Sequence, residues 1–221
     1  MLDAHGQALL QADAVVLCNA HDALRLLGEP GWPLQRVRGQ TTLLPADTPG
    51  LAYLPLDLPR ADQGYALRLA DGRVLCGAVA QPGDDEPALR AADHATHLDH
   101  LRRLTGWAGT VDAATLDGRV GWRLSADDKL PLLGPVPAVP AAGSKPITQV
   151  RFMPRVPGLW LFTALGSRGI TQAALGGELL AAWLTHSPSP VPAALIDALD
   201  PARFEVRAAR QAESAAPAPP R

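Results

Sequence analysis

Residues 158–169 read Gly-Leu-Trp-Leu-Phe-Thr-Ala-Leu-Gly-Ser-Arg-Gly, and this stretch decides the fold class. Residues 158–164 form a short apolar run, which is typical of a strand buried on both faces of a parallel sheet. The run leads into the turn Gly166-Ser167-Arg168-Gly169 and then into a helix. Free backbone N–H groups at such a helix start attract an anion, or a carbonyl that becomes anionic during a reaction. A plain tight turn without a ligand is the alternative.

The helix after this turn is expected to bury one apolar stripe at helical spacing. Gly176 and Gly177 each lower the helix propensity by about 1 kcal/mol, so we expect them where the helix closely approaches a neighbouring backbone. The stripe consists of Ile170, Ala173, Gly177, Leu180 and Leu184.

A second buried-strand signature, residues 14–18, lies near the start of the chain, and a short helix is expected at 22–27. A parallel strand needs parallel neighbours that are reached through crossover connections. Residues 1–13 cannot supply them, so this strand is expected to be the last of a sheet whose other strands are absent from the chain. Residues 1–33 are then the end of one domain, and the chain is expected to return to that domain, with its final strand and helix, at residues 125–207.

The middle of the chain, residues 34–124, predicts a second domain with a mostly antiparallel sheet. Turn sequences separate its strand-like runs, and Asp71-Gly72 between two of them is a hairpin signal. A helix is expected over 86–104, with Leu89, Ala92, Leu101 and Leu104 facing the core. The strand-like runs are 34–44, 51–56, 65–69, 73–79 and the region around 111–124.

Two further segments have the composition of irregular structure. Residues 135–146 are rich in Pro and Ala and predict an exposed loop. Residues 208–221 carry little apolar bulk and predict a disordered tail.

The composition limits the function classes. The chain has 221 residues, 22 acidic and 20 basic side chains besides histidine, and a net charge of −2, so no overall basic excess indicates nucleic acid as a partner. The start lacks the features of a signal peptide, and no apolar helix candidate is long enough to cross a membrane. The cytoplasm is therefore the expected location. Cys18 and Cys76 lie in apolar runs without CxxC spacing and predict two reduced core thiols.

The segment around Trp122 contains two arginines, Arg119 and Arg123, whose spacing of four places them on one face of a strand. Two guanidinium groups on one face favour an anion, and a substrate carboxylate binds arginine through two hydrogen bonds. The alternatives are exposure to solvent or ion pairs with nearby carboxylates. The candidate carboxylates are those of Asp117, Asp127 and Asp128.

His94, His97 and His100 do not predict a metal site. Their spacing spreads the rings around a helix, and the HExxH pattern is absent. We expect them on a solvated face, paired with Asp93 and Asp99.

The order of these segments resembles the D-amino-acid-oxidase-like family of flavoenzymes, which includes glycine oxidase and sarcosine oxidase. Within that family, the chain is most similar to the flavin half of the bifunctional enzymes that modify the wobble uridine of tRNA. The resemblance covers roughly residues 10–207. It is carried by residues 12–20, 37–40, 75–78, 118–123, 128–134, 164–171 and 198–204.

The resemblance implies a partial two-domain α/β fold, with the remnant of a parallel-sheet FAD domain and an antiparallel-sheet substrate domain. It also implies an FAD-dependent oxidoreductase acting on a CH–NH group. In these tRNA enzymes the flavin half removes the carboxymethyl arm of carboxymethylaminomethyl-(2-thio)uridine. A methyltransferase half that uses S-adenosylmethionine then methylates the amine. tRNA is therefore the expected substrate of the complete protein, and no metal is expected.

The resemblance also assigns roles to individual residues. Arg123 is expected to hold the substrate carboxylate, with Arg119 beside it. No residue is assigned a catalytic role. The expected FAD contacts are Cys18, Asn19, Ala20, Gly39, Gln40, Gly166, Ser167, Arg168, Gly169, Ile170 and Thr171.

One departure from the family pattern keeps alternatives open. The GxGxxG segment that binds the FAD diphosphate is absent, and we expect it before residue 1, so this chain is expected to bind FAD weakly or not at all. One alternative is part of a generic FAD-dependent amine or amino-acid oxidase. The other is an inactive remnant that acts at most as an interaction module.

Overall fold

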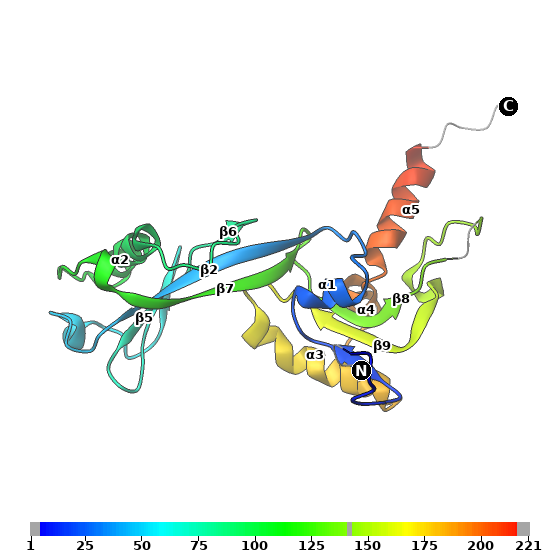
Figure 1. The fold of residues 1–221 in the computed structure, drawn as a ribbon, viewed down its shortest axis with the longest axis horizontal. Coiled ribbons are helices and arrows are strands. Elements are labelled where there is room, and N and C mark those ends of the chain that lie inside the picture. Colours follow the sequence, from blue (N-terminus) through cyan, green and yellow to red (C-terminus); the bar gives the residue numbers. More distant parts are fainter. Residues whose placement is uncertain (1–4, 141–142, 216–221) are drawn as a thin grey trace. The chain divides into compact units, whose positions relative to one another are not determined.

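The computed structural model describes residues 5–140 and 143–215. The chain divides into two compact units (Figure 1). Unit 1 comprises Met1–Gln35 and Leu124–Arg221, and unit 2 comprises Arg36–Arg123. Each unit is described by itself.

Unit 1 is built on a three-stranded sheet in the order β1-β9-β8. Strand β1 (Val15–Leu17) runs parallel to β9 (Arg155–Thr163), with Val16 opposite Trp160. Strand β8 (Leu132–Pro137) is antiparallel to β9. Parallel and antiparallel pairing together with the helices confirms the predicted α/β class.

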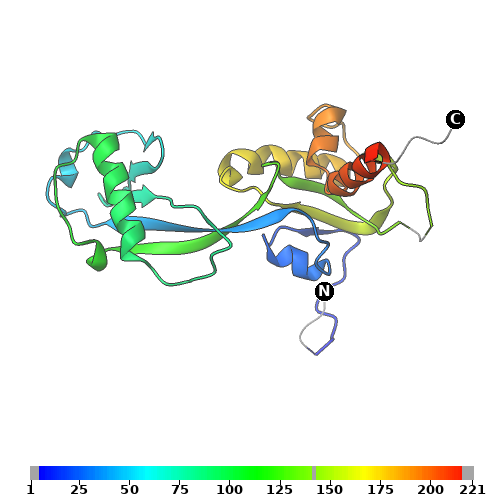
Figure 2. The same ribbon diagram turned by 90° about the horizontal axis from the view of Figure 1, so that it is seen from above.

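Helices pack on both faces of this sheet (Figure 2). Helix α3 (Gly169–Leu184) and helix α4 (Ala193–Leu199) cover one face, where Leu133, Trp160 and Phe162 meet Leu179 and Leu199. On the other face, Ala23 of helix α1 (Asp22–Leu26) and Phe204 of helix α5 (Arg203–Ala215) pack with Leu132 and Leu161. A short 3-10 helix, η3 (Val150–Phe152), contributes Val150 to a small cluster against α5.

Strand β1 differs from the predicted buried strand because it lies at the edge of the sheet. Val15 is 43% exposed, and β1 has no strand partner on its other side within residues 5–140 and 143–215. Cys18 is exposed, whereas Cys76 in unit 2 is buried, and burial raises the pKa of Cys76 to about 12. The prediction of a core thiol therefore fails for Cys18.

Helix α3 turns a different face to the sheet from the predicted one. Gly176, Leu179, Leu180 and Ala182 are buried, whereas Ile170 is 98% exposed. A Cβ at Gly176 would lie 2.3 Å from the Phe162 ring, so this glycine permits a close approach, but to a side chain rather than a backbone. Ala173, Gly177 and Leu184 of the predicted stripe are also exposed.

The end of the chain is helical where disorder is expected. Residues 208–215 continue helix α5, and residues 216–221 lie outside the described part of the chain. Val206 packs with Val150 and Met153, and Arg210 Nε donates to the carbonyl of Thr148 at 2.8 Å. These contacts hold a helix whose composition alone predicts disorder. Residues 135–137, which were predicted to belong to an exposed loop, instead form the end of strand β8.

Unit 2 contains a six-stranded sheet whose centre is the long strand β2 (Leu34–Leu44). Strand β2 pairs with β5 (Val74–Gly77) and β6 (Gln81–Pro82), and with β7 (Asp117–Ala126). Strand β4 (Tyr65–Arg68) joins β3 (Arg60–Ala61) to β5, and Gly72 has φ +85° in the β4–β5 hairpin. The remaining short elements are the 3-10 helices η1 (Leu51–Tyr53) and η2 (Ala113–Thr115).

The predicted strand at 51–56 is instead η1 and a turn. The N–H groups of Leu51, Leu54 and Leu56 bond to nearby carbonyls, so their apolar side chains enter the core from local turns rather than from a strand.

Helix α2 (Ala91–Thr105) packs against β4 and β5 but begins five residues after the predicted start. The delay has a physical cause, because Arg38 of β2 binds the carbonyls of Glu86 and Ala88. Its buried residues are Asp93, His94, His97, Leu98 and Leu101, so the expectation of a solvated histidine face is wrong.

The helices contain no candidate for a membrane span. Over residues 5–140 and 143–215, none combines the necessary length with the necessary hydropathy.

Candidate functional site

The expected FAD contacts of unit 1 gather at one edge of its sheet. Because β1 and β9 are parallel, the residues that follow them, Cys18–Ala20 and Ala164–Thr171, lie at the same end of the two strands. The hydroxyl of Thr163 donates to the carbonyl of Ala20 at 3.1 Å and ties these segments together. Ligands of open α/β sheets bind at the carboxyl ends of the strands, so this edge is a suitable place for a cofactor.

The N-terminus of helix α3 points its free backbone donors out of the turn 166–169. Gly166 has φ +56°, and its N–H bonds to the carbonyl of Leu124 at 3.0 Å. The N-cap residue is Arg168, whose side chain makes no cap hydrogen bond. Within the described residues, no side chain satisfies the first-turn N–H groups, so an anionic or carbonyl ligand fits there. Ser167, Arg168, Ile170 and Thr171 are exposed.

In unit 2, the guanidinium of Arg123 lies directly over the backbone of Gly39. A Cβ at Gly39 would come within 2.6 Å of Nη2 of Arg123, so the absence of a side chain makes room for the guanidinium. Arg123 is half-buried, and in the described part of the chain no carboxylate lies within ion-pair distance of it. A partly buried guanidinium without an anionic partner is suited to bind a carboxylate.

In the described part of the chain, none of the alternative carboxylates forms an ion pair with Arg119 or Arg123. Asp128 binds Arg203 at 2.9 Å and Arg207 at 2.5 Å. Burial alone would raise the pKa of Asp128, but the hydrogen bonds from Arg203 and Arg207 outweigh it and hold the pKa below its usual range. Arg119 is exposed and lies four residues before Arg123 in strand β7. Trp122 serves neither arginine, because it stacks with Arg36.

Sequence reasoning missed Tyr65. Burial raises the pKa of its phenol, and the positive charge of Arg123 partly offsets the rise. Its hydroxyl would lie 2.8 Å from a Cβ at Gly77, so a second glycine makes room for it. The only available signal was the position of Tyr65 at the start of a strand opposite the Leu75–Ala78 segment.

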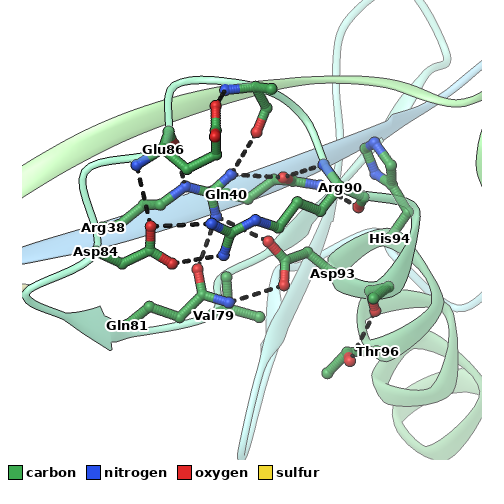
Figure 3. A network of polar contacts seen from close by, with 12 residues as sticks. Arg38, Gln40, Val79, Gln81, Asp84, Glu86, Arg90, Asp93, His94 and Thr96 are labelled. Atoms are coloured by element: carbon green, nitrogen blue, oxygen red, sulfur yellow. Dashed lines mark hydrogen bonds and ion pairs between the residues drawn. The ribbon is translucent and has the colours of Figure 1, made fainter.

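The side chain of Gln40, an expected FAD contact, is fully buried (Figure 3). Its Oε1 accepts from the backbone N–H of Arg90 and from Arg38, and its Nε2 donates to the carbonyl of Arg90 at 2.9 Å. These bonds occupy both ends of the amide and fix the start of α2. The side chain is therefore unavailable to a cofactor, and only the backbone of Gln40 remains a candidate contact.

Two of the three histidines join a buried chain of hydrogen bonds. Oγ1 of Thr42 lies 2.7 Å from Nδ1 of both His94 and His97, and Nε2 of His97 accepts from the N–H of Val79 at 3.1 Å. Neutral His97 therefore carries its proton on Nδ1 and donates to Thr42, whose hydroxyl donates to His94. Burial lowers the pKa of His97 to about 4. Over residues 5–140 and 143–215, no cluster of three His, Cys, Asp or Glu residues suits a metal ion.

The fold is that of a flavin-dependent oxidoreductase. The family model described as FAD dependent oxidoreductase matches residues 2–183, and the chain belongs to this family. FAD is the cofactor that the membership implies, and the uncapped α3 N-terminus and the exposed residues Cys18 and Asn19 fit such a group.

Among curated proteins, the chain is similar to the tRNA 5-methylaminomethyl-2-thiouridine biosynthesis bifunctional protein MnmC of Burkholderia multivorans (strain ATCC 17616 / 249). The two are 47% identical over 215 residues, which cover 95% of this chain and 32% of that protein. The chain thus spans about a third of the length of this relative and matches its flavin domain.

Solved structures show the same fold. The crystal structure of iminodiacetate oxidase (IdaA) from Chelativorans sp. BNC1 has a TM-score of 0.64 and 24% identity, covering 86% of this chain and 47% of that one. Glycine oxidase from Geobacillus kaustophilus has a TM-score of 0.62 and 20% identity, with 86% and 45% covered.

Proposed function

We propose that this chain supplies the carboxylate-binding arginine and the flavin-edge helix of an enzyme that removes the carboxymethyl arm of carboxymethylaminomethyl-(2-thio)uridine at the tRNA wobble position. The observation that carries the proposal is Arg123, half-buried over Gly39 with no carboxylate beside it among the described residues. The arm that is removed ends in a carboxylate, which is the partner this guanidinium lacks.

The chemistry assigns separate tasks to the two units. When bound, FAD would supply the hydride acceptor for oxidation of the carbon between the amine and the carboxylate of the arm. The resulting C=N bond is hydrolysed by water, which leaves the aminomethyl group on the uridine and releases the arm as an aldehyde acid. Arg123 holds the carboxylate in place during hydride loss. The N–H groups of Gly169, Ile170 and Thr171 offer positive charge to a cofactor edge that becomes anionic on reduction.

The test is a chimera in which residues 5–215 replace the matching segment of the Burkholderia multivorans relative. We expect tRNA nucleoside mass spectrometry to show loss of the carboxymethyl arm, and Arg123→Ala to raise KM for the free acid much more than for its methyl ester. Arg103→Ala changes an exposed arginine of α2 and serves as the matched control. Equal effects of Arg123→Ala on acid and ester would remove the carboxylate role.

A free amino acid or amine is the second candidate substrate, and the net charge of −2 favours it because the chain has no general attraction for RNA. The same chimera distinguishes the two. Turnover of iminodiacetate or glycine without turnover of tRNA would assign the site to small amines. A chimera that binds FAD but turns over neither would favour the inactive remnant.

A further inference from the structure

Strand β2 carries a fully buried arginine, Arg38, whose polar contacts are drawn in Figure 3. The next residue, Gly39, is the glycine that lies under Arg123. Arg38 has no exposed surface, and its guanidinium makes five hydrogen bonds that together fix its position. Its partners are Glu86 O at 2.6 Å, Ala88 O at 2.6 Å, Gln81 Oε1 at 2.7 Å, Asp93 Oδ2 at 2.8 Å and Gln40 Oε1 at 3.1 Å.

This network and Arg123 lie on opposite faces of β2. Successive side chains of a strand point to opposite faces, so Arg38 and Gln40 share one face and Gly39 presents the other. The guanidinium of Arg123 occupies that second face, 2.6 Å from where a Cβ of Gly39 would be. Backbone shifts at Gly39 therefore move the surface against which Arg123 rests.

The network also holds the second piece of that surface. The carbonyl oxygen of Val79 lies 3.3 Å from the Cβ position of Gly39. The N–H of Val79 is held by His97 at 3.1 Å, and Gln81 two residues later bridges Arg38 and Asp93, with Nε2 donating to Asp93 at 2.9 Å. The backbones of Gly39 and Val79 thus form the surface against which the Arg123 guanidinium rests. The hydrogen-bond network around Arg38 connects both to helix α2.

We propose that Arg38 is a positioning residue, which through Asp93 and Gln81 holds the backbone of Gly39 and Val79 where the Arg123 guanidinium can face an anionic substrate group. The planar fork of arginine satisfies five acceptors at once, and lysine cannot reproduce that arrangement. The inference rests on the proposed carboxylate-binding role of Arg123. The position of the guanidinium is nevertheless measurable without substrate or FAD.

Tyr65 reports that position, because the charge of Arg123 lowers the pKa of its phenol. The chain has two tyrosines, and Tyr53, 92% exposed, is an internal control. With 13Cζ-labelled tyrosine, alkaline NMR titration of the chain follows both phenols separately. Near-UV circular dichroism establishes that each variant is folded.

We expect Arg123→Met to raise the pKa of Tyr65, because it removes the positive charge that lowers it. Arg38→Lys should also raise the pKa of Tyr65, although residue 123 is unchanged. Gly39→Ala should produce a similar rise by displacing the guanidinium directly.

A folded Arg38→Lys protein with the wild-type pKa at Tyr65 would overturn the proposal, as would an unmoved Tyr65 in Arg123→Met. If Arg38→Lys does not fold, Asp93→Asn is judged by the same criterion. Arg38→Lys could raise the pKa of Tyr65 while Arg123→Ala in the chimera affects the acid and the ester equally. That result would support the positioning role of Arg38 and reject only the proposed substrate.

Discussion

The two faces of strand β2 use arginine in opposite ways. On one face, Arg38 is fully buried, and acceptors from Gln40, Gln81, Glu86, Ala88 and Asp93 surround its guanidinium. On the other face, Arg123 is half-buried and has no carboxylate within ion-pair distance in the described residues. A guanidinium whose N–H groups all have acceptors within the protein stabilises the fold. A guanidinium without such partners keeps its N–H donors available for a ligand. The comparison predicts that equal substitutions on the two faces have unequal effects on stability.

The largest effect is expected for Arg38→Met. This change leaves Asp93 buried without its counter-charge at 2.8 Å, and loss of one partner of a buried pair costs about 3–5 kcal/mol. Urea unfolding of the variant should show that decrease in the free energy of unfolding. The double variant Arg38→Met/Asp93→Leu should recover a large part of it, because no charge remains buried. A single-variant loss below about 1 kcal/mol would break the contrast between the faces.

The histidines behind the same face predict a pH dependence of similar size. Burial lowers the pKa of His97 to about 4, so the folded state keeps the ring neutral while the unfolded state binds a proton below about 6.5. Stability from His97 is therefore complete above pH 6.5 and is lost as pH falls from 6.5 through 4, by up to about 3 kcal/mol. The pKa of His94 is lowered in the same direction. Urea unfolding at several pH values measures the slope, and His97→Gln should flatten it.

Two adjacent glycines of α3 provide a smaller test, in unit 1. A Cβ at Gly176 would lie 2.3 Å from Cζ of the Phe162 ring, so Gly176→Ala should destabilise the chain by about 1–3 kcal/mol. Nothing lies within 4 Å of a Cβ at Gly177, so Gly177→Ala should stabilise it by up to about 1 kcal/mol through helix propensity. Thermal unfolding of both variants measures the difference. Equal effects would mean that α3 does not pack on Phe162 through Gly176.

The sequence predicted the α/β class and the two apolar runs as strands, because both depend on short-range patterns. It did not predict that these runs pair with each other, since it placed the other strands of the first run's sheet outside the chain, whereas β9 is the parallel neighbour of β1. It placed β2 at residues 34–44, where the structure has it, and it identified the turn at Gly166–Gly169. These features are local, since composition and turn residues specify them.

What the sequence missed depends on contacts between distant residues. Helix α2 begins at Ala91 because Arg38, about 50 residues earlier, takes the carbonyls that would extend it. Two of its histidines, His94 and His97, are buried because the hydroxyl of Thr42 hydrogen-bonds to both rings. Gln40 was assigned to the cofactor by resemblance, but its amide binds the backbone of Arg90. Periodicity within one helix contains none of this information.

The smallest stability effect is expected on the open face of β2. Arg123→Met removes no ion pair seen in the described residues, so the free energy of unfolding should stay within about 0.5 kcal/mol of wild type. Binding should nevertheless change, because sodium acetate should shift the side-chain Nε–H signal of Arg123 in wild type, and its effects on the amides of Gly39 and Val79 should disappear in the variant. Arg103→Met, at an exposed site on α2, should change neither property. A loss of more than 2 kcal/mol in Arg123→Met would mean that this arginine is structural too, and the two faces would then differ only in exposure.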